Sequence, residues 1–323
     1  MEELKQRFLR PCRKLTDQFV IAGAIAFLLS IVGALLTEIA FKHLGLGENA
    51  GLPDYLSWTV SYLQFLGIWP LVILVMIVFP ANHPMLGRLI LRLRTGNTFA
   101  RLFLGFLIGF VCNAICVGIS VLRHDIALSF VGFDPVPLLI VLGGVFVQSG
   151  AEELVSRLYL QQKLLRRYKS PVVAVLLSAI FFAGLHAFNP GITAVSVAQL
   201  IVVALLLSVF CLYFDAFGMA AGMHTAWNYT QNIIFGLPNS GLVSEYSIFK
   251  IEAAANGPFF DTIFGVEGSV GALGVLVVAI VLTVVYIKAR GLKPVDIWAD
   301  AEAKARLASG EAPAPHTPRH MAK

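Results

Sequence analysis

Long apolar runs are the feature that most restricts how this chain can fold. Eight stretches of roughly 20 apolar residues, the length that spans a hydrocarbon core of about 30 Å, occur along its 323 residues. Hydrophobic residues make up 58% of the chain and charged residues only 13%, about half the charged fraction of a soluble protein. The sequence therefore predicts an all-α, polytopic membrane bundle with about eight transmembrane helices. The runs lie near residues 19–41, 57–79, 101–122, 136–162, 171–188, 196–214, 218–235 and 269–289.

No long polar segment interrupts the apolar runs, so we expect one membrane domain over residues 19–290 with a tail at each end. Residues 1–18 form a basic tail, and the first apolar run after them is long for a secretory signal, which predicts an uncleaved signal anchor. Residues 291–323 are polar and proline-rich, a composition typical of disorder. The longest connection between runs, about 236–268, is expected to act as a lid or as a connector.

Lysine and arginine residues collect in alternate connections, which predicts the orientation of the chain. Twenty of the 24 lie in the amino-terminal tail, in the connections around 88–101 and 163–169, or in the carboxyl-terminal tail. We therefore expect both termini in the cytoplasm, in a multi-pass protein of a bacterial inner membrane. The net charge of +5 sits in short clusters beside the runs, which indicates contact with the anionic lipid bilayer and argues against nucleic-acid binding.

Two pairs of glycines are spaced for close helix packing. Gly105 and Gly109 lie four residues apart in one run, and Gly218 and Gly222 do so in another. Small residues at this spacing let helices approach closely in lipid, so these runs are predicted to form tight helix contacts.

Three ionisable residues, Glu152, Glu153 and Arg157, lie inside the fourth apolar run. Each costs several kcal/mol at bilayer depth, which marks a functional site. On a helix Glu153 and Arg157 are four residues apart and can pair along one face. Glu152 then lies about 100° round the helix and can face a cavity, where a carboxylate serves as a general base.

Two histidines and an amide lie in later runs. Of seven histidines, only His186 and His224 fall within apolar runs, and Asn228 lies four residues after His224 on the same helix face. With a glutamate these residues suit hydrolysis, because a base can activate water, histidines can share the proton or bind a metal, and an amide can stabilise an oxyanion. The spacing alone does not identify the bond that is cut.

The order of these groups resembles a known family of intramembrane proteases. Over about residues 135–235, three motifs on successive helices are similar to those of the CAAX protease and bacteriocin-processing family, which includes type II CAAX prenyl endopeptidase-like proteins. The motifs are Glu152-Glu153-x-x-x-Arg157, Phe182-x-x-x-His186 and His224-x-x-x-Asn228. The resemblance implies an endopeptidase that hydrolyses peptide bonds of a membrane-anchored peptide or protein in a cavity open to the cytoplasm.

The resemblance also implies roles for the motif residues. Glu152 and His186 would activate a water molecule, and His224 and Asn228 would stabilise the oxyanion, while the second glutamate and the arginine of the first motif would hold that helix in place. The family is also described as metal-dependent, in which case Glu152, His186 and His224 would bind zinc with water as the fourth ligand. The sequence shows no carboxylate partner for either histidine, which favours the metal-free mechanism.

The first motif departs from many bacterial members of the family, which carry an aromatic residue before the arginine and a glycine after it. This chain has Ser156 and Leu158 at those positions. The departure leaves two other functions open. A non-proteolytic membrane scaffold or chaperone would bind a transmembrane partner in the same cavity and would tolerate Glu152→Ala. A proton-coupled transporter is disfavoured because the chain shows no internal repeat.

Overall fold

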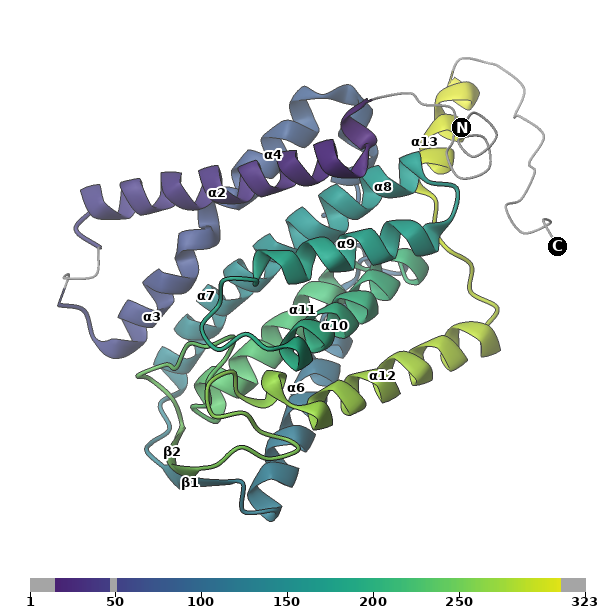
Figure 1. Ribbon diagram of the computed structural model, residues 1–323. Coiled ribbons are helices and arrows are strands. Elements are labelled where there is room, and N and C mark those ends of the chain that lie inside the picture. Colours follow the sequence, from purple (N-terminus) through teal and green to yellow (C-terminus); the bar gives the residue numbers. More distant parts are fainter. Residues whose placement is uncertain (1–14, 47–50, 309–323) are drawn as a thin grey trace.

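The computed structural model describes residues 15–46 and 51–308, and they form a mostly helical bundle (Figure 1). The helices are α2 (Phe19–His43), α3 (Asp54–Leu63), α4 (Ile68–Val78), α5 (His83–Leu86), α6 (Phe99–Leu122), α7 (Pro135–Glu153), α8 (Gln161–Arg167), α9 (Pro171–Leu185), α10 (Ala194–Tyr213), α11 (Phe217–Tyr229), α12 (Val270–Ala289) and α13 (Ile297–Ala308). Short 3-10 turns are η1 (Leu15–Asp17), η2 (Gln64–Gly67), η3 (Pro80–Asn82) and η6 (Val266–Gly268), and π-helical segments are η4 (Leu154–Leu160) and η5 (Thr230–Ile234).

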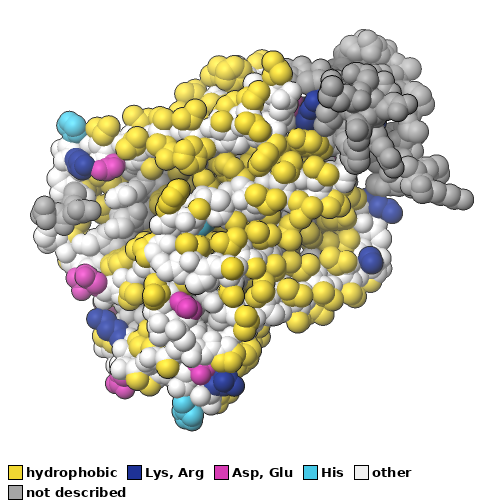
Figure 2. Space-filling view, in the orientation of Figure 1, with side chains coloured by type: hydrophobic (Ala, Val, Ile, Leu, Met, Phe, Trp, Pro, Cys, Tyr) yellow, Lys and Arg dark blue, Asp and Glu magenta, His cyan; other side chains and the backbone are white. Residues whose placement is uncertain are grey.

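Within the described residues, six helices are long and apolar enough to cross a membrane, and α9 is a shorter apolar helix. The chain is thus a multi-span helical membrane protein, with hydrophobic side chains over most of the face in Figure 2. The six correspond to α2, to α3 through α4, to α6, to α7 through α8, to α10 and to α12.

The run predicted near 218–235 is not among the six spanning helices. It folds as α11 followed by η5, and every side chain from Phe217 to Ile233 is buried. Packed against α6, α7 and α10, α11 is surrounded by protein, so it can carry polar side chains that lipid would exclude. Its low apolar content therefore reflects a central position in the bundle.

A two-stranded sheet corrects the all-α prediction. Strands β1 (Ile126–Phe130) and β2 (Phe249–Ala254) pair antiparallel, with a register shift between Ala127 and Leu128. The partners lie in two connections more than 100 residues apart in sequence, so no local pattern links them. The pairing ties the long connection of 236–268 to the rest of the fold.

The carboxyl-terminal segment also contains ordered structure. Where disorder was predicted from residue 291 onward, α13 forms, and Trp298 is buried and donates from Nε1 to the carbonyl of Gln162 at 2.9 Å. Asp17 contacts Lys163 and Arg166 on the same helix α8, so both ends of the described chain meet there. Residues 1–14 and 309–323 of the predicted tails lie outside the described residues.

The predicted close helix contact is formed between α6 and α11. A β-carbon at Gly105 would collide with the carbonyl oxygen of Met219, and one at Gly109 would collide with that of Met223. In the opposite direction, a β-carbon at Gly222 would collide with the carbonyl of Leu102. The two backbones touch along this seam, which sets the position of α11.

We expect Gly109→Ala to destabilise the protein by about 1–3 kcal/mol, because the added methyl group must push α6 away from α11. Thermal unfolding in detergent measures the effect as a lower Tm. Gly118→Ala is the matched control, since a β-carbon there meets nothing within 4 Å and alanine favours the same helix. Equal Tm values for the two variants would contradict the tight seam.

Candidate active site

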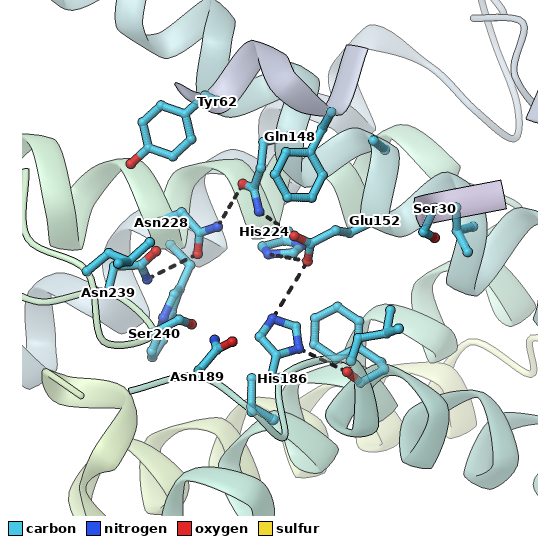
Figure 3. A pocket seen from close by; sticks show the side chains of 18 of the residues that line it. Ser30, Tyr62, Gln148, Glu152, His186, Asn189, His224, Asn228, Asn239 and Ser240 are labelled. Atoms are coloured by element: carbon cyan, nitrogen blue, oxygen red, sulfur yellow. Dashed lines mark hydrogen bonds and ion pairs between the residues drawn. The ribbon is translucent and has the colours of Figure 1, made fainter. Parts of the chain in front are cut away.

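A cavity of about 450 Å³ lies in the bundle beside the first predicted motif. Side chains of α2 and α3 form one wall, and those of α7, α9 and α11 form the other. Side chains of α10, the connection after α9 and the long connection before α12 also contribute to the lining. In Figure 2 a histidine side chain is visible inside a hollow of the surface, and Figure 3 shows the residues around the cavity.

The lining connections lie at the end of the bundle away from α8. The connection after α9, with Asn189 and Pro190, is at the end of that helix opposite to Pro171 and the basic residues that precede it. Under the predicted orientation this is the external end, whereas the family resemblance implies a cavity open to the cytoplasm. The cavity therefore extends away from the basic clusters that set the orientation.

Glu152 lies at the centre of the cavity, near the end of α7 (Figure 3). Its Oε1 accepts a hydrogen bond from Nε2 of Gln148, one helical turn earlier. Among the described residues no group donates a hydrogen bond to its Oε2, although that atom is buried. Two ring nitrogens face this atom, Nε2 of His224 at 3.8 Å and Nε2 of His186 at 3.9 Å. The structure thus brings together the three side chains that the sequence predicted on separate helices.

The other ring nitrogen of each histidine fixes which atom faces Glu152. His186 ends α9 and its Nδ1 contacts the carbonyl of Phe182 at 2.9 Å, while His224 Nδ1 contacts Oε1 of Glu153 at 3.0 Å. Carbonyl and carboxylate oxygens only accept, so the proton of each neutral imidazole lies on Nδ1. Both Nε2 lone pairs therefore point toward the unpaired oxygen of Glu152.

The spacing of these three atoms lies between that of a zinc site and that of a bridging water. Zinc–ligand bonds of about 2.0–2.2 Å in a tetrahedral site bring two ligand atoms within about 3.4 Å of each other. Two acceptors of one water with hydrogen bonds of about 2.8 Å lie about 4.6 Å apart. The observed 3.8 and 3.9 Å fall between these two values. Within residues 15–46 and 51–308, no group of three or more His, Cys, Asp or Glu side chains is arranged to hold a metal ion.

Glu153 has a second function besides its predicted pairing with Arg157. The pairing is present, with Glu153 Oε2 at 3.1 Å from Arg157 Nε, and both side chains are fully buried. The guanidinium also lies over the ring of Phe182, 4.3 Å from its centroid. The contact from His224 to the other oxygen of Glu153 supplies the carboxylate partner that the sequence had not revealed, so that argument against a metal was wrong.

The helices of the first and third motifs change to π-helical geometry next to their functional residues. The segment η4 follows Glu153 directly, and η5 begins two residues after Asn228. Such segments are rare and occur most often at functional sites, where the extra residue in a turn redirects the side chains. The two residues that differ from the family pattern, Ser156 and Leu158, lie within η4. Leu158 is buried in the apolar core, and the carbonyl of Ser156 accepts a hydrogen bond from the hydroxyl of Ser178 at 2.8 Å.

Asn228 reaches the cavity through a chain of polar contacts. Its Nδ2 donates to Oε1 of Gln148 at 3.2 Å, and its Oδ1 accepts from Nδ2 of Asn239 at 3.3 Å. Nδ2 of Asn239 also donates to Glu267 at 2.9 Å. The sequence interpretation missed Gln148, Asn239 and Glu267, although the spacing of Gln148 from Glu152 could have indicated the first.

Glu267 is a carboxylate of the cavity wall that lies just before α12, and it is only 4% exposed. Burial raises the pKa of its carboxyl above the usual value, and hydrogen bonds from Ser240 and Trp227 oppose that increase.

Neither the comparison with curated proteins nor that with solved structures found a match.

The family comparison agrees with the geometry of the site. Residues 134–230 match the model of the family described as type II CAAX prenyl endopeptidase Rce1-like, a family of CAAX-type intramembrane proteases that act on peptide or protein substrates. The matched stretch begins one residue before α7 and ends one residue after α11, so it contains all three motifs. Over residues 134–230 this chain therefore carries a domain of the Rce1-like type II CAAX prenyl endopeptidase family.

Proposed function

We propose that this protein is an intramembrane endopeptidase that hydrolyses peptide bonds of membrane-associated proteins or peptides with a glutamate-activated water. The observation that carries the proposal is the convergence of one unpaired carboxylate oxygen and two imidazole nitrogens at 3.8 and 3.9 Å. A single water held there would donate one hydrogen to Oε2 of Glu152 and the other to Nε2 of His186. We also propose that both termini face the cytoplasm.

In the proposed reaction Glu152 removes a proton from the water. At the same time the water oxygen attacks the carbonyl carbon of the substrate. His186 accepts a hydrogen bond from the water at Nε2. The NH2 group of Asn228 donates to the negative charge that develops on the carbonyl oxygen, and His224 donates to it when its Nε2 is also protonated. When the C–N bond breaks, the proton on Glu152 passes to the leaving nitrogen. Water is thereby divided between a new carboxyl group and a new amine.

Glu153 and Arg157 support this chemistry from behind the cavity. The ion pair neutralises one carboxylate within the apolar interior, and Glu153 fixes the ring orientation of His224. Zinc would be held by Glu152, His186 and His224 if those side chains moved closer together. Bound there, zinc would activate the water as a Lewis acid, and the steps above are assigned to the side chains alone.

The test is cleavage of peptides anchored in lipid vesicles by the purified protein, with products identified by mass spectrometry. Metal content is measured on the same sample. Cleavage without stoichiometric metal supports the glutamate mechanism, whereas activity that follows bound zinc would replace it with a metalloprotease mechanism. If a folded protein cleaves no anchored peptide, a non-proteolytic scaffold replaces the protease proposal.

We expect the charge of the cavity to select among substrates. Among the described residues that line it there is no lysine or arginine, whereas Glu152 and Glu267 both contribute to the lining. A substrate carboxylate close to the cleaved bond would therefore be repelled. A peptide that ends in an amide three residues after the cleaved bond should have a kcat/KM about tenfold higher than the same peptide ending in a carboxylate. Equal values for the two peptides would contradict this charge selection.

A further inference from the structure

A buried carboxylate outside the family stretch has every acceptor position occupied. Glu267 receives hydrogen bonds from Nε1 of Trp227 at 2.8 Å and from Nδ2 of Asn239 at 2.9 Å on one oxygen. Its other oxygen receives the backbone N–H and the hydroxyl of Ser240, both at 2.9 Å. Because four donors already surround it, Glu267 is unsuited to bind a ligand, and its effect must be on its neighbours.

The first neighbour is an amide whose orientation the carboxylate determines. A carboxylate only accepts, so Asn239 must turn its NH2 group, not its carbonyl, toward Glu267. The same NH2 group donates to Oδ1 of Asn228 at 3.3 Å. Asn228 must then direct its own NH2 group away from Asn239 and toward Gln148 at 3.2 Å and Ser149 at 3.4 Å, at the wall of the cavity (Figure 3).

The opposite end of this chain of contacts is also a carboxylate. Gln148 accepts from Asn228 at its oxygen and donates from its nitrogen to Glu152. Three amides thus lie between two groups that only accept, and every hydrogen bond in the chain has a defined direction. An asparagine amide has nearly the same shape when it is rotated by 180°, so packing alone does not fix which end faces the cavity.

We propose that Glu267 is a positioning residue that, through Asn239, holds the NH2 group of Asn228 toward the cavity, where it donates to the oxyanion. This inference rests on the proposed protease function. Glu267→Gln keeps the size of the side chain but adds a donor within a shell of four donors. Asn239 can then reverse and place its own oxygen against Oδ1 of Asn228. Asn228 is then directed only from the side of Gln148, and the share of molecules in which its oxygen faces the site of negative charge increases.

The first test is the kinetics of Glu267→Gln in the vesicle cleavage assay. We expect kcat to fall about tenfold while KM stays within about twofold, because the lost contact forms only in the transition state. Glu252→Gln is the matched control, since it makes the same chemical change on an exposed carboxylate of β2. A change in KM with kcat unchanged, or an equal loss of kcat in both variants, would overturn the proposal.

The second test separates positioning from a general structural effect. If Glu267 acts through Asn228, Glu267→Gln should cause no further loss in a protein that already carries Asn228→Ala. The same tenfold loss in both backgrounds would show that the two residues act independently and would overturn the proposal. The Tm of each variant is measured in parallel to confirm folding.

A third measurement needs no substrate, so it distinguishes this inference from the proposed function. In protein labelled with ¹⁵N at asparagine, the side-chain amide signals of Asn228 and Asn239 are assigned from Asn228→Ala and Asn239→Ala. We expect Glu267→Gln to shift both signals and Glu252→Gln to shift neither. Shifted signals in a protein that cleaves nothing would support the amide chain and reject the protease, whereas an unmoved Asn228 signal would overturn the inference.

Discussion

Glu152→Gln should lower kcat/KM for anchored peptides by about 10³-fold or more, since it removes the group that takes the proton from water. The substitution preserves size, and its amide oxygen can still accept from Gln148. We therefore expect an unchanged Tm, which separates loss of chemistry from loss of folding. The measurement is the initial rate of product formation in vesicles at several substrate concentrations.

The control for this experiment is Glu38→Gln, which removes an exposed carboxylate of α2 that pairs with Lys42 at 2.6 Å. It should cleave at the rate of the unmodified protein. Activity in Glu152→Gln comparable to that of the control would exclude Glu152 as the base. The scaffold or chaperone hypothesis, which requires no proton acceptor, would then explain the cavity better.

Loss of either partner of the buried ion pair should have the largest effect on stability. Glu153→Leu leaves Arg157 charged and fully buried without a counter-charge, and Arg157→Leu leaves Glu153 in the same state. Removing one member of such a pair costs about 3–5 kcal/mol. The free energy of unfolding, measured by denaturant titration in detergent, should fall by that amount in each single variant.

The double variant Glu153→Leu/Arg157→Leu distinguishes the two functions of Glu153. Stability should largely recover, because no uncompensated charge remains. Activity should stay about 10 to 100-fold low, since His224 has lost the carboxylate that orients its ring. A double variant that regains full activity would show that the contact with His224 has no catalytic importance.

The sequence predicted most helix positions because span length is a strong physical constraint. The run expected near 101–122 is α6 at Phe99–Leu122, and the run near 269–289 is α12 at Val270–Ala289. The pairing of Glu153 with Arg157 followed from helical spacing alone. In each of these cases the relevant contacts lie within one segment, so a local pattern was sufficient.

Features built from distant segments could not be predicted in the same way. β1 and β2 are short strands in separate connections, and the position of α11 at the centre of the bundle depends on packing with three other helices. Asn239 lies in the long connection and Glu267 in the single turn η6, both too short of regular structure for a periodicity to mark the side that faces the cavity. Their contact with Asn228 becomes evident only when the fold brings the connections over the helices.

The wall formed by α2 and α3 lies outside the stretch that matches the family. This wall contributes Phe27, Ile31, Trp58 and Tyr62 to the cavity, whereas all proposed bond-breaking groups belong to residues 134–230. Reactive groups and much of the surface that a substrate meets are therefore encoded in separate parts of the chain. If the proposed protease function holds, exchange of the first two spans should change which membrane proteins are cut while the bond-breaking groups stay the same.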